Sequence, residues 1–133
     1  MPVCRHYGLG NVVWSPLAMG ILTGKYVDAG KPPAGTRAAG AQKEMMEDYF
    51  TQPVLDAVQR LRPLARQAGC TLAQLALAWC LREHAVTSTI VGATKVEHLD
   101  ENLGAADLEV DPKIFDDVNR ILEPVLPHEP YLA

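Results

Sequence analysis

The sequence predicts an α/β fold built on parallel strands. Two short apolar runs with strand-like composition, 11–17 and 86–93, are separated by segments that carry helix-start signals. Such runs are typical of strands that are buried on both faces of a parallel sheet, and their alternation with helices favours that arrangement. Two strands cannot form a sheet with both faces covered. We therefore expect residues 1–133 to be part of a larger barrel or sheet.

Composition and charge describe one globular domain and exclude several classes of function. With 48% hydrophobic and 21% charged residues, the 133-residue chain has room for a modest core. A formal net charge of −4, with the basic residues scattered, argues against sequence-independent nucleic-acid binding. No apolar segment approaches the roughly 20 residues that cross a bilayer, and the start does not resemble a signal peptide. We expect neither a nucleic-acid partner nor membrane insertion.

The cysteines indicate the compartment. Cys4, Cys70 and Cys80 are odd in number and lack the spacing of a metal site. Cys70 and Cys80 lie in apolar helical surroundings, where buried free thiols are usual. A reducing, cytoplasmic setting is therefore expected.

The first third of the chain alternates short elements with a long loop. Residues 3–7 have the composition of a helix end that glycine stops, and the strand 11–17 should lose its pairing at Ser15-Pro16. Residues 21–26 suit one helical turn. The loop 27–41 is rich in Gly, Pro and Ala, and loops of this length are usually lids or disordered. We favour a lid because it carries Lys31 and Arg37.

Four helices are expected in the remainder of the chain, and three of them lie outside the stretch 88–103. The first covers 51–68 and should be kinked at Pro63, which removes a backbone hydrogen bond. The second begins at Thr71, where Gln74 completes a capping box, and its nearly uniform apolar character predicts deep burial. The last begins at Asp111-Pro112, an N-cap followed by proline at N1. The proline-rich tail 124–133 is expected to be extended.

The stretch 88–103 joins the second strand to a further helix. A strand ends at Gly92-Ala93, and Thr94 with Glu97 spells a second capping box. Free N–H groups and the helix dipole make such a helix start a ready anion site, and Lys95 would support a bound phosphate. The alternative is an ordinary strand-to-helix turn. One apolar stripe follows at helical spacing: Val96, Leu99 and Leu103.

Three segments, in order, resemble the aldo-keto reductases. WSPLAMGILTGKY (14–26) is similar to that family's segment at the seventh barrel strand, and GCTLAQLALAWCLR (69–82) to its seventh barrel helix. VGATKVEHLDENLGA (91–105) resembles the eighth strand and the cofactor-holding helix. The branch nearest in pattern contains the potassium-channel β subunits and related microbial reductases. The resemblance implies the C-terminal part of an eight-stranded α/β barrel, a partial domain over 1–133 that is incomplete on its own, with NADP(H) as cofactor and aldehydes or ketones as substrates.

The resemblance also assigns cofactor contacts on the nicotinamide side. Trp14 takes the place of the aromatic ring that stacks on the nicotinamide, although it could be a plain core tryptophan. Lys25 and Arg37 match cations that reach the phosphates, and an exposed loop arginine is the alternative for Arg37. The stretch that passes the ribose and pyrophosphate is matched by Ser15, Pro16, Leu17 and Gly20.

Contacts on the adenosine side are implied by the second segment. Gly92 and Thr94 match contacts near the 2′-phosphate, and the charge of Lys95 favours NADP over NAD unless it is a solvated helix lysine. His98 stands where the family commonly has glutamine, which leaves that contact open, and it could be a surface histidine. The pair that bonds the adenine amine is matched by Glu101 and Asn102, which could otherwise be solvated helix residues.

The resemblance does not supply catalysis. In the family the catalytic Asp, Tyr, Lys and His lie on the first four strands, which these residues do not contain, so the isolated chain is expected to be inactive. Its partner would be the missing N-terminal barrel half, or a second copy through self-association. The alternatives are a non-catalytic nucleotide-binding or channel-β-subunit-like regulatory module, or an inactive fragment. None of the four tyrosines inherits the proton-donor role: Tyr7, Tyr26, Tyr49 and Tyr131.

Overall fold

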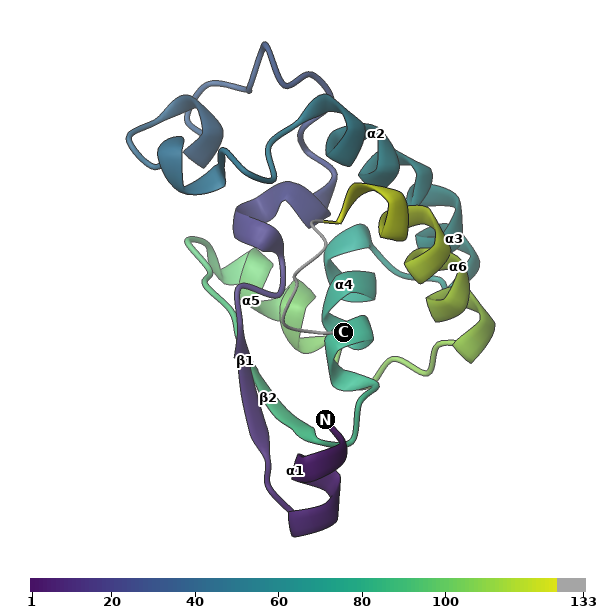
Figure 1. The fold of residues 1–133 in the computed structure, drawn as a ribbon. Coiled ribbons are helices and arrows are strands. Elements are labelled where there is room, and N and C mark those ends of the chain that lie inside the picture. Colours follow the sequence, from purple (N-terminus) through teal and green to yellow (C-terminus); the bar gives the residue numbers. More distant parts are fainter. Residues whose placement is uncertain (127–133) are drawn as a thin grey trace.

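The computed structural model describes residues 1–126 as helices gathered beside a two-stranded parallel sheet (Figure 1). The strands are β1 (Asn11–Trp14) and β2 (Val86–Ile90). Helix α4 lies between this sheet and a layer made of α2, α3 and α6 (Figure 1). The α-helices are α1 (Pro2–Tyr7), α2 (Gln52–Arg60), α3 (Arg62–Gln67), α4 (Leu72–Leu81), α5 (Val96–Leu103) and α6 (Pro112–Leu122). Short 3₁₀ helices are η1 (Ala18–Thr23), η2 (Arg37–Ala39), η3 (Glu44–Met46) and η4 (Glu123–Val125).

The two strands pair in parallel, which confirms the predicted topology. Val12 lies opposite Ser88 and Trp14 opposite Ile90, with one irregularity next to Asn11. Both strands are shorter than expected, because pairing stops before Ser15-Pro16 and after Ile90. The prediction of burial on both faces is wrong for this chain, since Val12 and Ile90 are each 60% exposed. Helix α4 packs against β2, and on the strands the side chains of Val12, Trp14 and Ile90 are exposed.

Local signals place most helix boundaries correctly. The helix expected over 51–68 breaks at Leu61 into α2 and α3, with Pro63 in the first turn of α3, so the proline ends one helix and starts another. The Thr71 hydroxyl accepts from the backbone N–H of Gln74 at 3.2 Å, and the Gln74 side chain accepts from the Thr71 N–H at 3.1 Å. Asp111 caps α6 through the Lys113 N–H at 2.9 Å.

Three expectations are corrected, and the structure also shows which way the apolar stripe of α5 faces. The Thr94–Glu97 capping box does not form, because α5 starts one residue later with Lys95 as an extended N-cap and no side-chain bond. The stripe of α5 faces outward, with Val96 71% exposed, since nothing among the described residues packs on it. Helical geometry falls at 18–23 instead of 21–26 and is interrupted by left-handed residues at its centre. In the tail, 123–125 forms a 3₁₀ turn, whereas 127–133 lies outside the described residues.

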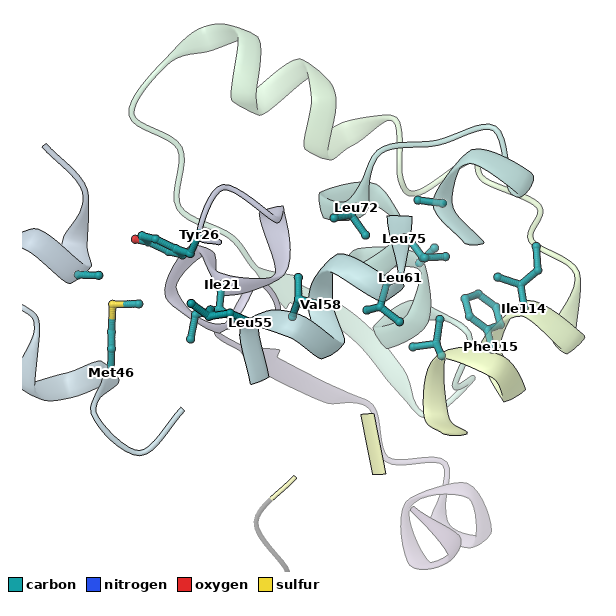
Figure 2. Packing of buried hydrophobic residues seen from close by; sticks show 14 residues of the cluster. Ile21, Tyr26, Met46, Leu55, Val58, Leu61, Leu72, Leu75, Ile114 and Phe115 are labelled. Carbon is teal, nitrogen blue, oxygen red and sulfur yellow. The ribbon is translucent and has the colours of Figure 1, made fainter. Parts of the chain in front are cut away.

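The core lies on the side of α4 away from the sheet. It runs from Tyr26 and Met46 at one end to Ile114 and Phe115 at the other, as Figure 2 shows. Helices α2 and α3 contribute inward-facing side chains, among them Val58, which is buried. Helix α4 is less uniformly buried than its composition suggested, because several of its side chains, Trp79 and Cys80 included, are half-buried. The core therefore fixes α4 and leaves the sheet edge free.

Candidate cofactor cleft

A cleft of about 790 Å³ opens at the carboxyl ends of β1 and β2. Its walls come from the turn after β1 with η1, the loop at 35–37, the start of α4, the end of β2, and α5. The carboxyl ends of parallel strands are where α/β folds place ligands. The lining residues are Trp14, Ser15, Pro16, Leu17, Met19, Gly20, Thr23, Lys25, Gly35, Thr36, Arg37, Thr71, Ala73, Ile90, Val91, Gly92, Thr94, His98, Glu101 and Asn102.

The structure brings together twelve of the thirteen residues that the sequence suggested for cofactor contact. These come from segments up to about ninety positions apart in the chain, so their convergence is a result of the fold. The exception is Lys95, which is exposed at the N-cap of α5 and outside the cleft lining. Trp14 is 79% exposed at the end of β1, with its side chain on the same strand face as that of Val12.

The turn after β1 has unusual backbone geometry. Ser15, Ala18 and Met19 have positive φ angles of 53°, 45° and 55°, although none of them is glycine. Gly20 follows with φ 96°. Left-handed conformations at non-glycine residues are costly and cluster at ligand-binding sites, because the surrounding structure must hold them. The turn therefore marks this wall as a specialised part of the fold.

Helix α5 is tied to α4 by a glutamine whose second role the sequence did not indicate. The Gln74 side chain completes the capping box at Thr71 and also donates from Nε2 to the backbone carbonyl of Glu101 at 2.9 Å. A Cβ at Gly104 would approach this Nε2 to 2.9 Å, so glycine leaves room for the bond. The capping motif revealed Gln74 as a helix signal, whereas its reach to α5 needs the folded structure.

The net charge of the cleft lining is positive, whereas the net charge of the whole chain is negative. The lining contains Lys25, Arg37 and the half-buried Glu101, two cations against one carboxylate, with His98 counted as neutral. The complete chain has a formal charge of −4. A locally positive cleft on an acidic protein attracts anionic ligands. The cleft is suited to a phosphate-bearing molecule.

The cleft lining contains no tyrosine and no cysteine. Tyr26 lies in the core with 0% exposure, and its hydroxyl has no hydrogen-bond partner among the described residues. Burial raises the pKa of the Cys70 thiol, and it does the same for Cys80, where the Arg82 charge acts in the opposite direction. Within residues 1–126, no three His, Cys, Asp or Glu side chains gather to hold a metal. Nor does any helix of that part have the length and apolar content to span a bilayer.

A second cleft, of about 860 Å³, lies between α4 and α6 and contains none of the suggested residues. Arg82 lines it together with several carboxylates, including Glu109 and Asp116. The Arg82 guanidinium stacks over the Trp79 ring, 3.7 Å from the ring centroid. This arrangement offers one cation already engaged by an aromatic ring, and it lacks the open cationic wall of the first cleft.

Fold and cleft together define an α/β protein with an anion-suited site at the ends of its parallel strands. Residues 1–123 match the model of the aldo/keto reductase family, so the chain belongs to that family of oxidoreductases. Two similar plant proteins are each named "Probable voltage-gated potassium channel subunit beta". The one from Arabidopsis thaliana is 36% identical over 125 residues, and the one from Oryza sativa subsp. japonica is 37% identical. The match covers 92% of this chain but only 38% of each relative.

Proposed function

We propose that these residues form the cofactor-holding part of an NADP(H)-dependent reductase that converts aldehydes and ketones to alcohols. The observation that carries the proposal is the convergence of twelve suggested contact residues in one cleft of a chain that belongs to the aldo/keto reductase family. The chain spans about 38% of the length of the relatives it matches, and in this proposal a complete barrel carries the remaining functions.

The residues present fit a dinucleotide phosphate. A volume of about 790 Å³ lies within the range usual for cofactor sites. Gly20 leaves room for the Lys25 ammonium group in the cleft, because a Cβ at this position would lie 2.9 Å from the Lys25 nitrogen and displace it. Lys25 and Arg37 give the cleft two cations for a pyrophosphate, and Trp14 offers an exposed aromatic face at its sheet end. When bound, the cofactor supplies the hydride.

In this proposal the chain's own residues orient the cofactor and exclude water from part of it. The aromatic ring of Trp14 would stack against the nicotinamide, and Lys25 with Arg37 would hold the phosphates. The carboxamide of Asn102 and the carboxylate of Glu101 would bond the adenine amine. Lys95 would read the 2′-phosphate from the rim, because its exposed side chain lies next to the cleft residue Thr94.

The isolated 133 residues should not reduce carbonyls, because the cleft lining contains no tyrosine, the proton donor that the family resemblance implies. General acid catalysis needs a donor within hydrogen-bond reach of the carbonyl oxygen. Tyr26 is buried away from the cleft, and Tyr7 and Tyr49 are not among its lining residues. The test is an assay of the purified chain with NADPH and a panel of aldehydes, followed at the cofactor's absorbance. Binding without turnover is expected, and turnover should return when the matching N-terminal half is added in trans.

A second candidate is a non-catalytic nucleotide-binding regulatory module. The observation that favours it is the name of the two plant relatives, which describes them as channel subunits. The same assay separates the two functions. Turnover after the N-terminal half is supplied supports the reductase, whereas tight NADPH binding without turnover in the completed assembly supports the regulatory module. Absence of any NADPH binding would contradict both.

A further inference from the structure

Helix α2 holds the segment 24–29 through two glutamine side chains. Gln59 Nε2 donates to the carbonyls of Gly24 at 3.0 Å and Tyr26 at 2.9 Å. Seven residues earlier on the same helix, Gln52 donates to the Val27 carbonyl at 3.0 Å and accepts from the Ala29 N–H at 3.0 Å. Residues seven apart share a helix face, so the two glutamines bind the segment along one line.

Arg62 strengthens this attachment at the end nearest the cleft. Its Nη2 donates to the Gly24 carbonyl at 2.8 Å, and its Nε donates to Gln59 Oε1 at 2.6 Å. The Gly24 carbonyl therefore accepts two side-chain bonds, and both donors are joined to each other. Bonds from a charged donor are among the stronger hydrogen bonds in proteins.

Lys25 lies between the two carbonyls that Gln59 binds. Its neighbours Gly24 and Tyr26 are buried, whereas Lys25 is exposed and lines the cleft. Its ammonium nitrogen lies 5.1 Å from the centroid of the Tyr26 ring and close to Gly20. Because hydrogen bonds hold the backbone on both sides, the direction in which the Lys25 side chain leaves the backbone is fixed, and the side chain lines the cleft.

We propose that Gln59 and Arg62 are positioning residues that set Lys25 for a diphosphate ligand, an inference that rests on the proposed cofactor function. Neither residue lines the cleft, so they act through the backbone at Gly24 and Tyr26. A positioned ammonium loses less conformational freedom when a phosphate binds, which raises affinity. Without Gln59 and Arg62, Lys25 would keep its charge but lose its defined place.

A double-mutant cycle measures this dependence. Gln59→Glu keeps the side-chain shape and the acceptor for Arg62 but removes the donor to both carbonyls. We expect it to weaken NADPH binding to the full chain about five- to tenfold, because only part of the effect of the two lost hydrogen bonds reaches Lys25. Lys25→Ala should weaken binding roughly ten- to a hundredfold, and Gln59→Glu should add nothing in that background. Gln67→Glu, the same charge change at an exposed glutamine of α3, is the control.

A second pair of variants guards against a folding defect in Gln59→Glu. Arg62→Met should also weaken NADPH binding, whereas Arg66→Met removes the same charge from an exposed position of α3 and should not. Equal losses with and without Lys25 would overturn the inference, because Gln59 would then act through another group.

Lysine NMR tests the positioning without any ligand. After reductive ¹³C-methylation, Lys25 should give a signal shifted upfield by the Tyr26 ring relative to the other four lysines. Gln59→Glu and Arg62→Met should move that signal to the position of exposed lysines, and the two control variants should leave it unchanged. An unmoved signal would refute the positioning role. Absence of NADPH affinity in the wild-type chain would instead refute the proposed function and the ligand assigned to Lys25, and the lysine signal would still decide the positioning.

Discussion

Gly24→Ala should destabilise the chain strongly, because this glycine is required for two independent reasons. Its φ angle of 74° is left-handed, which costs a residue with a Cβ roughly 1–2 kcal/mol. A Cβ there would also lie 2.5 Å from Cδ1 of the buried Leu72 and 3.1 Å from Nη2 of Arg62. Such overpacking typically adds about 1–3 kcal/mol. The expected loss in the free energy of unfolding is therefore about 2–5 kcal/mol.

Gly69→Ala is the matched control, because it isolates the backbone contribution. Gly69 has φ 68° after α3, and a Cβ there would meet nothing within 4 Å. Only the conformational cost of about 1–2 kcal/mol should appear. Urea unfolding followed by circular dichroism gives both values. Equal losses at Gly24 and Gly69 would refute the packing argument, and with it the close approach of Leu72 and Arg62 to the segment that carries Lys25.

Three further predictions concern capping, pH and cofactor choice. Thr71→Ala should lower the free energy of unfolding by about 1 kcal/mol in urea, because it removes the cap bond to Gln74. Thr51→Ala should lower it by almost nothing, because the Thr51 side chain makes no cap bond. Equal losses would contradict the cap geometry. Burial raises the folded-state pKa of the Cys80 and Cys70 thiols above the ordinary 9.0. Above pH 9 the unfolded chain therefore loses these protons first, and the free energy of unfolding should fall as the pH rises. The fall should be less steep in a variant with both cysteines changed to alanine. In a completed barrel, Lys95→Ala should weaken NADPH binding roughly ten- to a hundredfold and change NADH binding little, as measured by calorimetry. Equal effects on both cofactors would show that Lys95 does not bind the 2′-phosphate.

Local signals in the sequence predicted helix boundaries correctly where the contacts that fix the boundary are between neighbouring residues. The break at Pro63 and the caps at Thr71 and Asp111 depend on atoms within a few residues, and the structure confirms each of them. The same motif failed at Thr94, where the preceding residues are exposed and no packing holds the first turn in place. A capping motif therefore predicts a helix start more reliably when tertiary contacts fix the chain before it.

The burial and positioning of side chains could not be predicted, because they depend on contacts between residues far apart in the sequence. The composition of β1 and β2 indicates strands covered on both faces, yet Val12 is 60% exposed among the described residues. The sequence placed Lys25 in the cleft through a resemblance, but its support comes from Gln59 and Arg62, more than thirty residues later. Nothing in their local pattern marks these two residues.

In the proposed function, NADP binds in the cleft at the carboxyl ends of the strands. A titration of the ¹⁵N-labelled chain with NADP⁺, followed by two-dimensional NMR, tests it residue by residue. The chain has two tryptophans, and only Trp14 lines the cleft, whereas the Trp79 indole N–H donates to Asn119 at 2.8 Å on the far side of α4. We predict that the Trp14 indole signal and the backbone amides of Gly20 and Gly92 shift with added NADP⁺, and that the Trp79 indole does not. Unchanged spectra, or shifts at Trp79 without shifts at Trp14, would contradict the claim.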